Sequence, residues 1–71
     1  GQGYPRGLAG AQIPLISRIL AVAEVYDRML RRKDRSLEEN RREALARIRQ
    51  EAGTRFDPDI AALFVREMGE A

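Results

Sequence analysis

Two carboxylates three residues apart are the most chemically suggestive feature of this sequence. Glu24 and Asp27 lie within the longest apolar run of the chain, and on a helix this spacing places them on the same side. Paired carboxylates can bind a hard cation such as Mg²⁺ or can act as a general acid and base. A plainer interpretation is also open, because Arg28 and Arg31 each follow one of these acids by four residues and can form solvent-exposed ion pairs with them.

The composition restricts the chemistry that the chain can support alone. Its 71 residues include no histidine and no cysteine, and these are the usual ligands of transition metals. We therefore expect the chain by itself to lack a complete hydrolytic site, with no catalytic residue of its own. Its 13 basic and 11 acidic residues give a net charge of only +2, and nucleic-acid binding, which rests on the cluster from Arg28 to Arg35 alone, is not favoured.

The apolar periodicity predicts an all-α fold with three helices in a single domain covering residues 1–71. The helices are expected at about residues 14–33, 40–52 and 58–69, after a glycine- and proline-rich loop at residues 1–12. The first of them is predicted to be the core helix, with an apolar face that covers roughly half of its circumference. The residues of this face are Leu15, Ile16, Ile19, Leu20, Val22, Ala23, Tyr26, Met29 and Leu30.

Capping signals set the expected helix boundaries. Asn40 is a candidate N-cap of the second helix, with Glu43 three residues later as a variant of the capping box. Asp57 followed by Pro58 is a strong start signal for the third helix. No apolar run approaches the ~20 residues of a transmembrane helix and no signal peptide is evident, so we expect a cytoplasmic protein without a membrane segment.

The first twelve residues leave two interpretations open. The four glycines and one proline in this stretch exclude a helix and predict a loop. The loop is either a surface lead-in to the first helix or a backbone that can approach a ligand closely, with Tyr4 and Arg6 as contacts.

Several separate blocks of the sequence resemble the C-terminal half of an HD-GYP domain. The blocks are residues 1–10, 13–15, 18–27, 43–45 and 53–58, and together they span nearly the whole chain. The resemblance implies an all-helical fold, here the three-helix C-terminal portion of an HD-superfamily domain. It also implies a phosphohydrolase that uses two or three iron or manganese ions to cleave cyclic di-GMP or a related cyclic dinucleotide.

The resemblance assigns roles to individual residues. Gly3, Tyr4 and Pro5 match the signature loop, which in the family lies beside the active site. Glu24 stands where the family has a metal-binding aspartate, and the extra methylene moves its carboxylate by roughly an ångström, whereas metal–ligand distances vary by only about 0.2 Å. Asp27 matches the second aspartate of the same motif, which implies that it supports the metal ligands rather than binding the metal.

The connection after the first helix departs from the family pattern. The family commonly has Arg-Pro-Tyr-Arg where this chain has residues 33–36, Lys-Asp-Arg-Ser. Lys33 occupies the place of an arginine that resembles a substrate-phosphate contact. Lysine keeps the positive charge but cannot form the bidentate contact that arginine makes with a phosphate.

Two functions follow from the resemblance. The first is the C-terminal portion of an HD-GYP-type, metal-dependent phosphohydrolase acting on cyclic di-GMP, inactive as these residues alone and partnered by an upstream helical half. The alternative is a non-catalytic module that dimerises or docks on a partner. A helix built to pack against a missing half leaves apolar surface exposed, and such surface favours a homo-oligomer.

Overall fold

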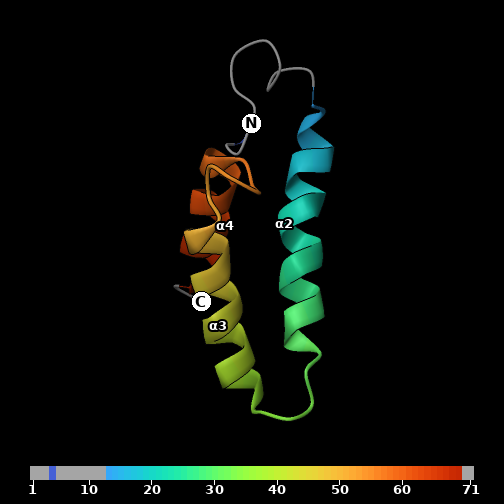
Figure 1. The fold of residues 1–71 in the computed structure, drawn as a ribbon, viewed down its shortest axis with the longest axis vertical. Coiled ribbons are helices and arrows are strands. Elements are labelled where there is room, and N and C mark those ends of the chain that lie inside the picture. The colour runs from blue at the N-terminus through green and yellow to red at the C-terminus, as the bar shows by residue number, and fades with distance from the viewer. Residues whose placement is uncertain (1–3, 5–12, 70–71) are drawn as a thin grey trace.

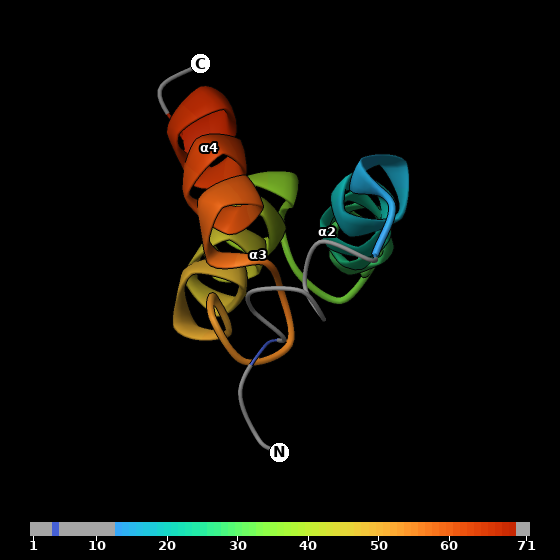
Figure 2. The same ribbon diagram turned by 90° about the horizontal axis from the view of Figure 1, so that it is seen from above.

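The computed structural model describes Tyr4 and residues 13–69, and within that part it consists of three α-helices. The helices are α2 (Leu15–Leu30), α3 (Leu37–Gln50) and α4 (Pro58–Gly69). Helices α2 and α3 run antiparallel side by side, and α4 packs behind α3 in Figure 1, as the view from above in Figure 2 also shows. The predicted all-α fold is confirmed.

The core lies where the three helices meet. Val22 and Val25 from α2 pack with Ile48 of α3, with Ala61 of α4, and with Phe56 from the connection between α3 and α4. At its edge the rings of Tyr26 and Phe64 meet edge to face, with their centroids 5.1 Å apart. The core is therefore small and draws on only the second half of α2.

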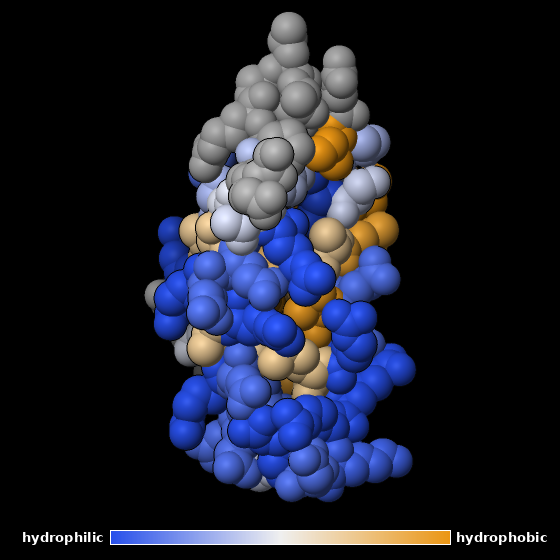
Figure 3. Space-filling view, viewed as in Figure 1, coloured by the Kyte–Doolittle hydropathy of each residue, from blue (hydrophilic) through white to orange (hydrophobic). Residues whose placement is uncertain are grey.

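The apolar face predicted for the first helix is exposed over the first half of α2. Leu15, Ile16 and Leu20 are 54%, 63% and 50% exposed. Figure 3 shows apolar surface gathered over the upper part of α2, whereas the opposite end of the molecule is hydrophilic. Val25 was not assigned to the predicted apolar face, yet it is buried against the core.

The boundary between α2 and α3 also differs from the prediction. Helix α2 ends at Leu30 rather than near residue 33, and α3 begins at Leu37 rather than at residue 40. Ser36 is the N-cap of α3: its Oγ accepts a hydrogen bond from the Glu39 N–H, and the Glu39 carboxylate accepts one from the Ser36 N–H, both at 3.0 Å. This reciprocal capping box satisfies two backbone donors at the start of the helix.

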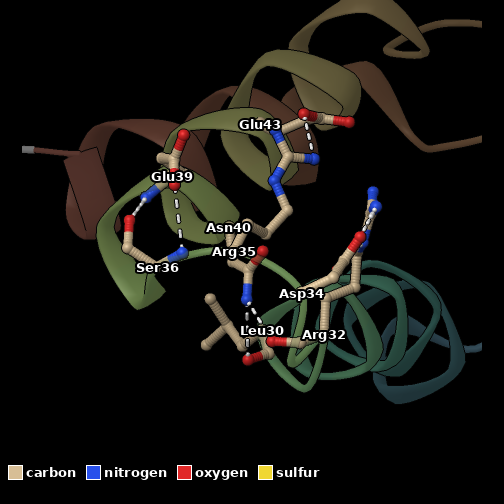
Figure 4. Close-up of polar contacts among 8 residues, drawn as sticks. All are labelled: Leu30, Arg32, Asp34, Arg35, Ser36, Glu39, Asn40 and Glu43. Atoms are coloured by element: carbon tan, nitrogen blue, oxygen red, sulfur yellow. Dashed lines mark hydrogen bonds and ion pairs between the residues drawn. The ribbon is translucent and has the colours of Figure 1, made fainter.

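Asn40 has a different role from the predicted N-cap. It is buried, and its Nδ2 donates hydrogen bonds to the carbonyl oxygens of Leu30 (3.3 Å) and Arg32 (2.8 Å), as Figure 4 shows. Glu43 does not complete a capping box but pairs with Arg35 at 2.6 Å. The Asn40 side chain therefore joins α3 to the C-terminal end of α2, where helix carbonyls lack intrahelical partners.

The connection between α3 and α4 is a tight turn that is anchored in the core. Gly53 has a φ of +88°, a conformation that favours glycine, and its N–H donates to the Phe56 carbonyl at 2.8 Å. The predicted cap of α4 is confirmed, because Asp57 Oδ1 accepts hydrogen bonds from the N–H groups of Asp59 (2.8 Å) and Ile60 (3.1 Å). The predicted second helix extended to residue 52, whereas α3 ends at Gln50.

Among the residues that the structure describes, no helix combines the length and the apolar character needed to cross a bilayer.

Candidate functional site

Glu24 presents its carboxylate to solvent from the middle of α2. The residue is exposed, and it takes part in none of the ion pairs or side-chain hydrogen bonds formed among the described residues. The ion pair with Arg28 suggested by their spacing is absent from that set. Nothing in this part of the structure therefore occupies the carboxylate, although it lies on the outside of the helical unit rather than in a cavity.

Asp27 forms the exposed ion pair that its spacing from Arg31 suggests. Its Oδ2 lies 2.7 Å from Arg31 Nη2, and both side chains are largely exposed. Such a pair on a helix surface contributes little to stability because water competes for both charges. The structure does not bring Asp27 together with Glu24 around a shared ligand.

Lys33 lies in the exposed connection between α2 and α3. Its neighbours Arg32 and Asp34 form a bidentate pair, with Nε to Oδ1 at 3.0 Å and Nη2 to Oδ2 at 2.7 Å. The hydrogen bond from Arg32 lowers the pKa of the Asp34 carboxyl below its usual value. Lys33 itself is exposed and takes part in none of the ion pairs formed among the described residues.

The residues described here do not form a metal centre by themselves. They contain no group of three or more histidine, cysteine, aspartate or glutamate side chains placed to hold an ion. The whole chain also lacks histidine and cysteine. A centre with several metal ions therefore does not fit these residues alone, and Glu24 offers it one carboxylate at most.

The predicted signature loop is described only at Tyr4. The Tyr4 N–H donates a 2.7 Å hydrogen bond to the Gly53 carbonyl, so this residue contacts the connection between α3 and α4. Its exposure is intermediate. Gly3, Pro5 and Arg6 lie outside the described residues.

An ion pair that sequence reasoning missed links the starts of α2 and α4. Arg18 Nη1 lies 2.9 Å from Asp57 Oδ2, and Arg18 Nε donates to the Ile13 carbonyl at 3.1 Å. The Asp57 side chain is only 10% exposed, and the Arg18 guanidinium lowers the pKa of its carboxyl. Arg18 is a cation at the border of an apolar helix face, and that placement is the signal from which a buried partner could have been suspected. We call this unit of Ile13, Arg18 and Asp57 the Arg18–Asp57 clasp.

Comparisons with known proteins place the chain in a family. A sequence profile described as HD domain matches residues 1–60. The chain is 42% identical over 67 residues to a probable cyclic di-GMP phosphodiesterase of Vibrio cholerae, and 43% identical over 66 residues to the cyclic di-GMP phosphodiesterase response regulator RpfG of Xanthomonas campestris. These alignments cover 94% and 93% of this chain.

A shorter match is to a relative that is named for a different cyclic dinucleotide. A stretch of 26 residues, 37% of this chain, is 65% identical to a 3'3'-cGAMP-specific phosphodiesterase 1 of Vibrio cholerae. The three matches cover 15%, 18% and 6% of these relatives, so the chain spans less than a fifth of each. No solved structure matches the chain significantly. The profile match over residues 1–60 and the two long alignments show that the chain belongs to the HD domain family.

Proposed function

We propose that the chain is the C-terminal portion of a cytoplasmic, HD-GYP-type phosphodiesterase that acts on cyclic di-GMP. The observation that carries the proposal is the similarity over 93–94% of the chain to proteins named for that activity. The fold is consistent with it, because α2 leaves an apolar surface that a larger helical domain would cover. These 71 residues alone are inactive in this proposal, since they contain no histidine or cysteine to complete a metal centre.

In this proposal Glu24 supplies one carboxylate to an iron or manganese centre whose other ligands come from outside the chain. Support comes from its place in the motif at residues 23–27 and from its exposed carboxylate, which has no partner among the described residues. Asp27 stays in its ion pair with Arg31 and has a supporting role. Both roles depend on how the remaining part of the domain packs against α2.

Lys33 is proposed to contact a phosphate of the cyclic dinucleotide. The support is its position in the connection between α2 and α3 and the pairing of Asp34 with Arg32, which leaves the ammonium group unneutralised. A single ammonium donates to one phosphate oxygen at a time, so we expect a weaker substrate contact than an arginine would give.

A chimeric enzyme tests the proposal. The segment of the Vibrio cholerae probable cyclic di-GMP phosphodiesterase that aligns with this chain is replaced by the chain, and cyclic di-GMP hydrolysis is assayed with Mn²⁺ or Fe²⁺. We expect hydrolysis by the chimera and none by the 71-residue chain alone. Turnover by the short chain would contradict the requirement for outside ligands, and a folded but inactive chimera would contradict the proposed activity.

The exposed apolar face of α2 also supports the second function, a non-catalytic helical module that forms a homo-oligomer or docks on a partner. Leu15, Ile16 and Leu20 form neighbouring positions on one side of the helix. Light scattering over a wide concentration range separates the two functions. Self-association that Ile16→Ser and Leu20→Ser abolish together would favour the module, and a monomer at all concentrations would count against it.

A further inference from the structure

The connection between α2 and α3, residues 31–36, is held by side-chain contacts on both sides of Lys33. These contacts join Arg31 to Asp27, Arg32 to Asp34, Arg35 to Glu43, and Ser36 to Glu39. Lys33 is exposed and takes part in no ion pair or side-chain hydrogen bond among the described residues. Within this connection, Lys33 is therefore the side chain that the contacts of its neighbours leave unengaged.

A buried asparagine restrains the backbone next to Lys33. Asn40 is 2% exposed, and its Nδ2 donates to the carbonyl oxygen of Arg32 at 2.8 Å (Figure 4). That carbonyl belongs to the peptide group that joins Arg32 to Lys33. Because a peptide group is planar, a bond that fixes its oxygen also restricts the position of the Lys33 Cα atom.

The Asn40 amide also ties this peptide group to the end of α2. Its Nδ2 donates to the carbonyl oxygen of Leu30, the last residue of α2, at 3.3 Å. Its Oδ1 is buried and has no hydrogen-bond partner among the described residues. The reverse orientation of the amide would point an oxygen at two carbonyl oxygens, so only one orientation allows both bonds. One side chain thus restrains Lys33 relative to the helix that carries Glu24.

The ion pair on either side of Lys33 is a weaker restraint than Asn40. The side chains of Arg32 and Asp34 are 47% and 65% exposed, so water competes for both charges. Asn40 is shielded from that competition, and hydrogen bonds are stronger where water is excluded. We therefore expect the connection to loosen more when the Asn40 amide is lost than when this ion pair is lost.

We propose that Asn40 is a positioning residue for Lys33 and that it sets where the lysine ammonium meets a phosphate of the cyclic dinucleotide. The phosphate contact rests on the proposed function, whereas the restraint on the Lys33 backbone does not. The flexible four-carbon stem of lysine absorbs part of a backbone shift, so the expected effect on substrate binding is several-fold. The restraint and the substrate contact are tested by separate measurements.

Backbone amide relaxation of the 71-residue chain, measured by NMR, tests the restraint. Asn40→Ala removes the side-chain amide and places a good helix former in α3. Ile48→Val is the matched control, because it truncates a buried side chain of the same helix in the core. We expect the order parameter of the Lys33 amide to fall from about 0.8 to below about 0.6 in Asn40→Ala and to stay near about 0.8 in Ile48→Val. Equal values in the two variants, or a value below about 0.6 in the unsubstituted chain, would overturn the proposal.

A double-mutant cycle in the chimeric phosphodiesterase tests the link to the substrate. We expect Asn40→Ala to raise the KM for cyclic di-GMP about 5-fold and Ile48→Val to change it by less than about 2-fold. Lys33→Met removes the ammonium but keeps a flexible stem, and in that background Asn40→Ala should raise KM by less than about 2-fold. A merely structural role of Asn40 would raise KM equally in both backgrounds, and that result would overturn the proposal.

The outcomes separate this inference from the proposed function. If the chimera is active and Lys33→Met leaves KM unchanged, the phosphate contact of Lys33 and its positioning by Asn40 fail, while the proposed activity stands. If the unsubstituted chimera is inactive, the proposed function fails, and the relaxation experiment alone decides whether Asn40 restrains Lys33.

Discussion

The two halves of α2 both carry apolar side chains but have different surroundings. The first half, residues 15–21, exposes Leu15, Ile16 and Leu20, whereas the second half, residues 22–30, contributes Val22 and Val25 to the core. Periodicity describes which side chains share a face of a helix, but it carries no information about what covers that face. The contrast indicates that the described helices complete the packing of only one half.

The position of α4 accounts for the difference. Its ring contact with α2 is between Phe64 and Tyr26, which belongs to the second half. Within the described part of the chain, the first half is joined to α4 by the Arg18–Asp57 clasp, which is a polar contact. The first half is thus joined to the start of α4 without being covered by the described helices.

A pair of truncations in α2 is the strongest test of this comparison. Val22 is fully buried and Leu20 is half exposed. We expect Val22→Ala to lower the free energy of unfolding by about 2 kcal/mol, through lost apolar contact and a residual cavity, and Leu20→Ala to lower it by less than about 0.5 kcal/mol. Urea denaturation followed by circular dichroism measures both, and equal losses would show that the chain buries the first half as well, for example by self-association.

The capping box at the start of α3 predicts a smaller change in the free energy of unfolding than the Val22 truncation does. Ser36→Ala removes the hydroxyl that accepts from the Glu39 N–H, and we expect a loss of about 1 kcal/mol in the free energy of unfolding. Ser17→Ala, on the exposed surface of α2, is the control and should be nearly neutral. If Ser36→Ala were also neutral, the assigned capping box would be wrong.

The Arg18–Asp57 clasp, at the exposed first half of α2, predicts that the stability of the fold depends on pH. Arg18 lowers the pKa of Asp57 in the folded state, so this pair stabilises the fold above the unfolded-state pKa of about 3.9 and loses that contribution as the pH falls through the folded-state value. Stability below about pH 4 should therefore fall less steeply in Asp57→Asn than in the unsubstituted chain. Asp59→Asn should keep the original slope, and an Asp57→Asn slope equal to it would exclude the clasp as the cause.

The sequence predicts the elements better than the contacts between them. Three helices and the Asp57 cap were recoverable because periodicity and capping are local signals. The start of α3 was misassigned because Ser36 and Asn40 are both good caps with a glutamate three residues later. Tertiary structure decides between them: Asn40 is drawn to the carbonyls at the end of α2.

In the candidate site too, the sequence predicts the residues better than their contacts. The resemblance assigns different roles to Glu24 and Asp27, and the structure adds their contacts: Asp27 is in a surface ion pair, and Glu24 is outside any pair among the described residues. A buried partner of Arg18 could be suspected from the sequence, but Asp57 could not be identified as that partner, because the two residues are 39 positions apart and neither has a local pattern that specifies the other. Long-range polar contacts depend on the packing of whole helices.

Substitutions of Glu24 test most directly whether α2 has a role in the active site. In the chimeric phosphodiesterase, Glu24→Asp introduces the side chain that the resemblance to HD-GYP domains implies at this position, and Glu24→Gln removes the charge while keeping the length. Glu67→Gln, an exposed substitution on α4, is the control. We predict that kcat for cyclic di-GMP is equal or higher in Glu24→Asp and at least about 100-fold lower in Glu24→Gln. Equal kcat in Glu24→Gln and Glu67→Gln would contradict a role of this helix in the active site.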